Sequence, residues 1–307
     1  MRSLAIINQK GGVGKTTTAV NVAAAMACDG QRVLLLDLDP QSHTTMHLGI
    51  ELDADEASLY DVLIRGVPLG EAARSVNEHL AVIPAHIDLV GAEVELANRE
   101  NRETVLADAL QPYRPGFDTC IIDCPPSLGL LTINALASVH EIIIPLQPHF
   151  LALQGLGRLL ETVTLVRQAL NPALRVSGIV LCMYERTTRL AQEVRDDVVR
   201  FLRDADHEDA WYGARVYDTM IRRNIKLAEC PSFGQTIFDY APSSHGAEDY
   251  LALAKEIIAA PTEHPAPPPV PRGDAPEAEP DDADDLVDAA APSPPPQQTA
   301  AGDATSP

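Results

Sequence analysis

A glycine-rich segment between a predicted strand and a predicted helix holds residue types that bind phosphate. Glycines let backbone N–H groups curl around phosphate oxygens, and the helix N-terminus beyond them favours anions. Lys15 can reach β- and γ-phosphates, and the Thr16 hydroxyl can ligate Mg²⁺. We therefore expect ATP and Mg²⁺ to bind through this segment, at Gly11, Gly12, Val13, Gly14, Lys15, Thr16 and Thr17.

The loop departs from the plain pattern G-x-x-x-x-G-K-[ST]. Gly14-Lys15-Thr16 supplies the end of that pattern, but Gln9 stands at the first glycine position. A tighter variant is present, with Lys10 just before the first of the glycines. The alternative is a strand–helix turn that binds no ligand. Two lysines framing the loop, with a strand before it and a helix after it, argue against that alternative.

Acidic residues end two further predicted strands. Asp123 follows an apolar run, where a carboxylate that holds Mg²⁺ would lie. Asp37 and Asp39 end another run, and a carboxylate there can position an attacking water. Taken singly, each could be a helix cap or a solvated strand end. Because all three are expected at carboxyl ends beside the glycine-rich loop, we favour a shared site.

The chain alternates short apolar runs with helical segments, one of which is predicted at about residues 15–28. Such runs predict a buried parallel sheet covered on both faces. We expect an α/β fold, a doubly wound and mostly parallel sheet with helices on both faces, in one domain of residues 1–260. The predicted strands are residues 4–7, 32–37, 80–83, 119–123, 141–145 and 176–181.

Residues 261–307 differ in composition from the rest. They hold 13 of the 25 prolines and ten acidic residues, against one basic residue, Arg272. This predicts a disordered, acidic, Pro/Ala-rich tail that keeps the protein in solution or binds a partner. The formal net charge of −21 argues against a general nucleic-acid-binding surface.

Other segments exclude several classes of protein. The five cysteines form no CxxC pair, and Cys120 and Cys124 are expected to be buried free thiols. His43 and His47 lack a third metal ligand nearby. No apolar run approaches the ~20 residues of a membrane span, and residues 1–9 do not form a signal peptide. We expect a cytoplasmic protein.

Together these motifs resemble the deviant Walker ATPases, the ParA/MinD group, and above all its chromosomal ParA (Soj-like) branch. The likeness covers nearly all of residues 1–260. The segments that carry it are residues 8–18, 36–41, 122–136, 223–229 and 231–234.

The resemblance implies a P-loop NTPase fold and a role for several residues. Lys10 matches the signature lysine that reaches the partner's nucleotide in an ATP-bound homodimer. It would offset charge on the transferred phosphoryl group. Asp39 matches the residue that orients the hydrolytic water, and Asp123 matches the Mg²⁺ carboxylate. Lys10, Lys15 and Asp39 form the implied catalytic set. Pro231 matches a segment that borders the adenine.

The family also implies non-specific DNA binding on the nucleoid and stimulation by a ParB-like centromere-binding protein. Its basic positions map onto Arg186 and Lys226, with Arg189, Arg222 and Arg223 nearby in sequence. A local cluster can bind phosphates on an acidic protein because salt screens charges beyond ~8–10 Å. The acidic surface also suits a basic partner segment. For each position the alternative is an ordinary solvated cation.

The chain departs from the family at two places. Arg222 stands where proline usually precedes Arg-Asn, which would enlarge the basic patch or alter a strand end. Ser42-His43-Thr44-Thr45 replaces the common Gly-Asn-Ala-Thr, and this segment borders the nucleotide and the dimer interface. No helix-turn-helix precedes residue 10, so we expect no operator-binding domain.

Three other functions compete with chromosome or plasmid partition. A positioning ATPase for another cargo would use the same mechanism. A MinD-like division-site regulator would end in a basic amphipathic helix, whereas here an acidic tail follows a last helix predicted at residues 248–260. We therefore expect no membrane partner. A nitrogenase reductase would need cluster-ligating cysteines, which Cys120 and Cys124 do not supply.

Overall fold

The computed structural model describes residues 1–53 and 55–260. Within them lies a nine-stranded sheet of order β3-β4-β2-β5-β1-β6-β7-β8, with β9 paired to β7. All strand pairs are parallel except β3 with β4. The strands are β1 (Arg2–Ile6), β2 (Val33–Asp37), β3 (Arg74–Ser75), β4 (Leu80–Ile83), β5 (Thr119–Asp123), β6 (Glu141–Leu146), β7 (Arg175–Tyr184), β8 (Arg215–Val216) and β9 (Ile221–Arg222).

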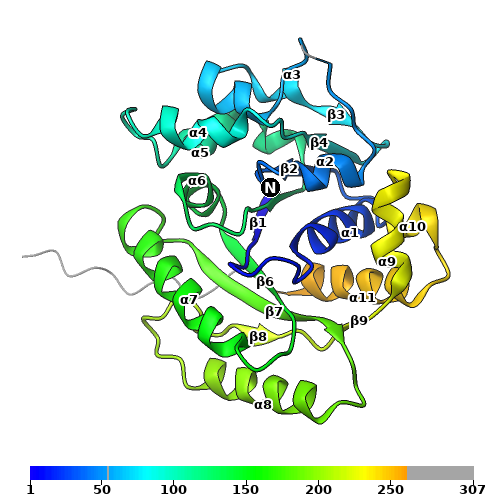
Figure 1. Cartoon of the computed structure of the whole chain (residues 1–307). Coiled ribbons are helices and arrows are strands. Elements are labelled where there is room, and N and C mark those ends of the chain that lie inside the picture. Colours follow the sequence, from blue (N-terminus) through cyan, green and yellow to red (C-terminus); the bar gives the residue numbers. More distant parts are fainter. Residues whose placement is uncertain (54, 261–307) are drawn as a thin grey trace, which may run out of the picture. The chain divides into compact units, whose positions relative to one another are not determined.

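Helices connect these strands and cover the sheet (Figure 1). The prediction of a doubly wound, mostly parallel sheet is confirmed. The predicted tail, residues 261–307, lies outside the described residues. The helices are α1 (Lys15–Cys28), α2 (His43–His47), η1 (Asp61–Arg65), α3 (Leu69–Ala72), α4 (Leu89–Leu96), α5 (Val105–Leu110), η2 (Gln111–Gly116), α6 (Leu130–Ser138), α7 (Ala152–Ala169), α8 (Arg189–Arg203), α9 (Ile225–Glu229), η3 (Cys230–Phe233), α10 (Ile237–Tyr240) and α11 (His245–Ala259).

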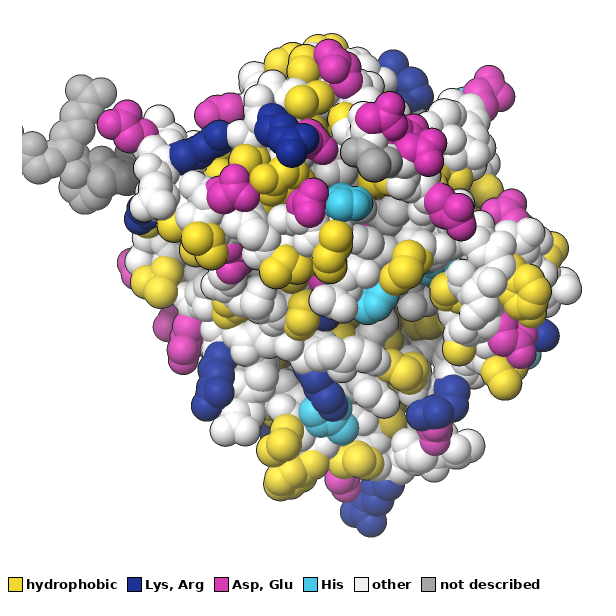
Figure 2. Space-filling view, turned by 45° about the horizontal axis from the view of Figure 1, so that its top comes forward, with side chains coloured by type: hydrophobic (Ala, Val, Ile, Leu, Met, Phe, Trp, Pro, Cys, Tyr) yellow, Lys and Arg dark blue, Asp and Glu magenta, His cyan; other side chains and the backbone are white. Residues whose placement is uncertain are grey.

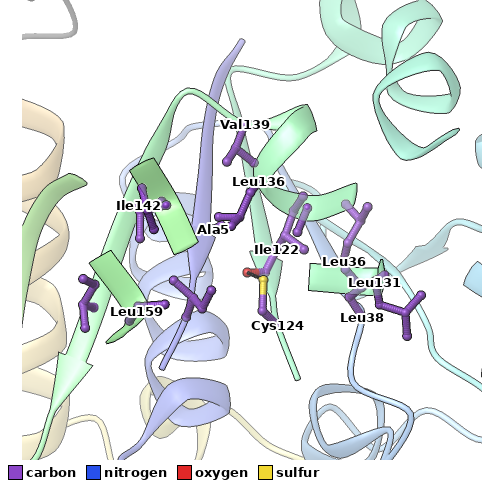
Figure 3. Packing of buried hydrophobic residues seen from close by; sticks show 14 of the residues in the cluster. Ala5, Leu36, Leu38, Ile122, Cys124, Leu131, Leu136, Val139, Ile142 and Leu159 are labelled. Carbon is purple, nitrogen blue, oxygen red and sulfur yellow. Dashed lines mark hydrogen bonds between the residues drawn. The ribbon is translucent and has the colours of Figure 1, made fainter. Parts of the chain in front are cut away.

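Alternate residues along each central strand pack into different halves of the core. In β2, Val33 and Leu35 join the cluster that contains α1 and α11, while Leu34 and Leu36 join the cluster of α4 to α8. Successive strand side chains point to opposite faces, so a strand buried on both faces must be apolar throughout. Figure 3 shows the cluster of α4 to α8, where Ala5 and Ile122 lie beside α6. The continuous apolar runs in the sequence therefore report burial on both faces.

The strand order brings three distant segments to one edge of the sheet. β1 lies between β5 and β6, and β5 lies between β1 and β2. In the register, Asp123 at the end of β5 is opposite Ile6 on one side and Asp37 on the other. The loop after β1 and both acidic strand ends therefore share the carboxyl edge, where ligands of such sheets bind.

The last described helix, α11, packs against α1 on one face of the sheet (Figure 1). Its Tyr250 hydroxyl lies 3.1 Å from the Thr18 hydroxyl, and both side chains are buried. α11 starts three residues before the predicted helix and ends at Ala259. Across residues 1–53 and 55–260, no helix has the length and apolar character needed to cross a membrane.

Candidate functional site

The loop between β1 and α1 takes its shape from two glycines with left-handed backbone. Gly12 has φ 74° and Gly14 has φ 95°, a region that residues with a Cβ rarely occupy. Gly14 is the N-cap of α1, and no side chain of the described residues caps that end. The first N–H groups of this 14-residue helix are therefore available to an anion.

Asp123 lies at the base of this loop in a fully buried position. Its Oδ2 accepts hydrogen bonds from the Thr16 and Thr44 hydroxyls, both at 2.8 Å. Its Oδ1 is also buried and has no hydrogen-bond partner among the described residues. A buried carboxylate oxygen without a partner is costly and suits a bound cation or its water. The sequence placed Thr44 in a segment that borders the nucleotide, but it did not predict this contact, which comes from another helix.

The electrostatics of the two charged groups fit a nucleotide–cation site. Burial raises the pKa of Asp123 to about 6, although the Thr16 and Thr44 hydroxyls oppose the shift. Burial also lowers the pKa of Lys15, while Asp123 and Asp39 favour its charged form. Each group lacks full compensation for its charge. Phosphate at Lys15 and Mg²⁺ at Thr16 and Asp123 would supply it, so these residues fit both groups.

Asp39 and Asp37 differ in their surroundings. Asp37 is fully buried, and its Oδ2 accepts bonds from the backbone N–H and the hydroxyl of Thr45, at 2.8 and 2.7 Å. Burial and the charge of Asp123 together raise the pKa of Asp37 to about 8, although the hydrogen bonds from Thr45 oppose the shift. Asp39 is 6% exposed and lines the cavity beside the loop. Asp37 therefore anchors the segment, and Asp39 remains the candidate for positioning water.

A cavity of about 710 Å³ opens beside the glycine-rich loop, a size that fits a small ligand. It brings together most of the predicted phosphate-binding residues and Asp39, while Val13 and Pro231 are not among the lining residues. Sequence reasoning missed part of the remaining cavity wall. This part of the wall includes Cys182, Met183, Asn224, Ile225, Leu227 and Tyr250.

Met183 in this wall has a left-handed backbone, with φ 52°. It lies at an irregularity in the β7–β9 pairing, between Cys182 and Tyr184. Strained backbone of this kind gathers at ligand sites. An apolar strand sequence gives no signal for such a conformation, so only the structure reveals it.

Lys10 lies outside the cavity that Lys15 lines. Its side chain is exposed, and with Val13 it lines a second hollow of about 340 Å³ together with His149 and part of α7, including Arg158. Its carbonyl accepts a hydrogen bond from the Lys15 ammonium at 3.3 Å. The two lysines of the loop therefore line different hollows, and of the two only Lys15 lines the larger cavity.

Four of the five predicted DNA-binding residues are exposed on the surface near α8 and α9, namely Arg186, Arg189, Arg223 and Lys226. Arg186 has no ion pair within the described part of the chain. Arg189 pairs with Glu193 at 3.0 Å, and Lys226 pairs with Glu229 at 2.8 Å. Figure 2 shows cations interspersed with acidic side chains on the face it presents. On that face they do not form one continuous basic patch.

The neighbouring arginines 222 and 223 have different environments. Arg223 forms an exposed pair with Glu185 at 2.9 Å. Arg222 lies at the end of β9 and binds Asp249 through Nε and Nη2, with a shortest distance of 2.6 Å. Its backbone N–H also donates to Asp249, at 2.9 Å, and Nη2 reaches Glu248. Two carboxylates on α11 therefore hold the Arg222 side chain.

The cysteines conform to the expectation of buried free thiols. Cys120 and Cys124 are both free and fully buried. No group of three or more His, Cys, Asp or Glu residues that could hold a metal occurs in residues 1–53 and 55–260. A cation at Asp123 would therefore need ligands from Thr16, phosphate and water, as Mg²⁺ commonly has.

Comparison with known proteins places this geometry in a family. The sequence model described as "AAA domain" matches residues 1–176. The chain is 45% identical to the chromosome partitioning protein ParA of Myxococcus xanthus over 258 residues, covering 84% of this chain and 88% of the relative. It is 47% identical to the sporulation initiation inhibitor protein Soj of Bacillus subtilis over 257 residues, covering 83% and 98%.

A solved structure of cobyrinic acid a,c-diamide synthase from Mycobacterium smegmatis, with bound ADP and magnesium, is similar in fold and sequence. Its TM-score is 0.71 at 37% identity, covering 84% of this chain and 94% of that one. The matches span nearly the whole of the partition relatives, with the phosphate loop and both acidic strand ends inside them. The chain therefore belongs to the AAA domain family and, within it, to the ParA/Soj group of chromosome-partitioning ATPases.

Proposed function

We propose that this protein is an Mg²⁺-dependent ATPase that partitions a chromosome or plasmid. The observation that carries the proposal is the fully buried Asp123 beneath the phosphate loop, hydrogen-bonded to Thr16 and with one oxygen lacking a partner among the described residues. A cavity large enough for a nucleotide adjoins it. The partition names of the relatives at 45 and 47% identity point to the same activity.

In the proposed site, residues of the loop bind phosphate and cation. Lys15 and the N–H groups of residues 11–17 hold the phosphates, and Thr16 with Asp123 holds Mg²⁺. The cation would neutralise charge on the phosphates. Asp39 orients the attacking water, because it combines near-complete burial with a place on the cavity wall. A fixed carboxylate there lowers the entropic cost of bringing water into line.

Lys10 acts on the nucleotide of a partner subunit in this proposal. What supports the idea is its exposed side chain and its position in a different hollow from Lys15. A cation supplied by a second protomer would stabilise charge on the transferred phosphoryl group. ATP binding would then favour a homodimer, and hydrolysis would require it.

We further propose that the ATP-bound dimer binds DNA without sequence preference and thereby associates with the nucleoid. Arg186 and Lys226 are the leading contacts, followed by Arg189 and Arg223. Arg222 is a weaker candidate because two carboxylates already hold its guanidinium. A ParB-like partner with a basic segment would stimulate hydrolysis and release the dimer from DNA.

Titration of random-sequence duplex DNA with the purified protein tests the proposal. ATP, ADP and no nucleotide are compared across a salt series. We expect binding that requires ATP and weakens steeply with salt. Arg186→Ala should weaken binding and should reduce by about one the slope of the logarithm of the binding constant against the logarithm of salt concentration. Arg200→Ala on α8, an exposed arginine paired with Asp197, is the matched control.

ATP-driven dimerisation without DNA binding in any nucleotide state would contradict the DNA-bound mechanism. That result would indicate that the ATP-bound dimer acts at a protein or membrane surface, as in the MinD-like alternative. A positioning ATPase for another cargo would pass the DNA test, so cargo is assigned by imaging the labelled protein with the chromosome. The diamide synthase named above is 37% identical to this chain, less than the partition relatives are. The proposed function therefore rests on the partition relatives.

A further inference from the structure

Helix α2 places adjacent threonines on two neighbouring carboxylates. The Thr44 hydroxyl donates to Asp123 Oδ2 at 2.8 Å, and the Thr45 hydroxyl donates to Asp37 Oδ2 at 2.7 Å. Asp37 and Asp123 lie directly opposite each other in the β2–β5 register. All four side chains are buried. One short helix is therefore tied to the ends of both strands.

The Thr44 hydrogen bond reaches far across the sequence. A buried threonine in a helix can satisfy its hydroxyl with a backbone carbonyl three or four residues earlier. Thr44 instead donates to a carboxylate 79 residues away, the same oxygen that accepts from Thr16. Oδ2 of Asp123 is thus held by hydroxyls from α1 and α2, while Oδ1 has no partner in the part of the chain that the structure describes.

This arrangement also fixes the residue proposed to orient water. Asp39 and Ser42 are joined by a backbone hydrogen bond of 2.8 Å, and the Ser42 carbonyl accepts from Met46 N–H within α2 at 2.9 Å. Asp39 therefore leads into α2 through a closed turn. A displacement of α2 away from Asp123 would move Asp39 as well.

We propose that Thr44 is a positioning residue that holds Asp123 and α2 together, and so aligns the cation site with Asp39. The inference rests on the proposed role of Asp123 and Thr16 in holding Mg²⁺. With Oδ2 fixed by two hydroxyls, Oδ1 is the oxygen left to accept from a cation-bound water. Residues that hold a metal-site group in place commonly change metal affinity 10- to 100-fold when altered.

Binding of Mn²⁺, followed by electron paramagnetic resonance with a non-hydrolysable ATP analogue, tests this role without turnover. We expect Thr44→Ala and the nearly isosteric Thr44→Val to weaken Mn²⁺ binding about 10-fold. Thr44→Ser keeps the hydroxyl and should restore affinity to within about 2-fold of the parent. Met46→Ala, on the exposed side of the same helix, is the matched control and should bind like the parent. A thermal melt of each variant checks folding.

The outcomes separate this inference from the proposed function. If Thr16→Ala loses Mn²⁺ but both Thr44→Ala and Thr44→Val bind like the parent, the positioning role is wrong and the cation site remains. If the parent protein with the analogue binds no Mn²⁺, the cation site itself is wrong and the inference falls with it. If Thr44→Ala does not fold, Thr44→Val and Thr44→Ser decide, because they retain the β-branch or the hydroxyl.

Discussion

The ion pair between Arg222 and Asp249 should contribute far more to stability than that between Arg223 and Glu185. Arg222 is 36% exposed and Asp249 9%, whereas Arg223 and Glu185 are 66% and 46% exposed. Arg222 also contacts Asp249 through two guanidinium nitrogens and its backbone N–H. Two adjacent arginines on one strand end thus provide a matched comparison.

The expected magnitude follows from burial. Removing one partner of a fully buried pair costs about 3–5 kcal/mol, because the other charge is left uncompensated. Water reaches part of the Arg222 guanidinium, so we expect about 2 kcal/mol for Arg222→Ala. Exposed pairs contribute about 0–1 kcal/mol, and Arg223→Ala should fall in that range. Arg222→Lys keeps the charge but loses the planar fork, so it should cost roughly 1 kcal/mol.

Urea and thermal unfolding, followed by circular dichroism without nucleotide, measure these differences. For a protein of this size about 2 kcal/mol corresponds to a lowering of Tm by about 4–8 °C. High salt should reduce the small effect of Arg223→Ala more than the effect of Arg222→Ala. Equal losses for the two alanine variants would refute the reasoning, since they would mean that burial of Asp249 does not make its partner important.

Four further predictions concern the site. Lys15→Ala should abolish ATP binding in calorimetry, because a buried phosphate contact is lost; retained tight binding would mean that the loop is misassigned. Lys10→Ala should still bind ATP but fail to dimerise or hydrolyse it, and parental dimerisation and turnover would exclude a cross-dimer role. Asp39→Ala should slow turnover and accumulate the ATP-bound dimer on size-exclusion chromatography, so undiminished turnover would exclude Asp39. Ser42 has φ 56°, so Ser42→Val should lower stability by about 1 kcal/mol or more, while Ser42→Gly should not; equal melting points would show that this turn carries no strain.

Much of the fold could be predicted from the sequence because the central strands are buried on both faces. A doubly buried strand must be apolar throughout, so β1, β2, β4, β5, β6 and β7 were each visible as an apolar run. The phosphate loop was visible for a similar local reason. Left-handed turns at Gly12 and Gly14 require glycine, and the lysine and threonine that follow are fixed in position by the start of α1.

The short strands β3, β8 and β9 could not be predicted, since two residues carry no periodicity. Their positions depend on neighbouring strands that offer free hydrogen-bonding groups. The rest of the cavity wall was hidden for a related reason. Cys182 and Tyr250 are buried residues of a strand and a helix, and only chain packing brings them to the cavity.

The sequence by itself determined which residues have the chemistry to bind phosphate and cation, because that chemistry depends on residue type and local backbone. The tertiary structure decided which of them meet. Parallel pairing placed Asp37 beside Asp123, and α2 brought Thr44 onto a carboxylate 79 residues away. It also separated Arg222, tied to Asp249, from Arg223 at the surface. Long-range contacts of this kind depend on strand order and on the packing of distant segments, which no local pattern encodes.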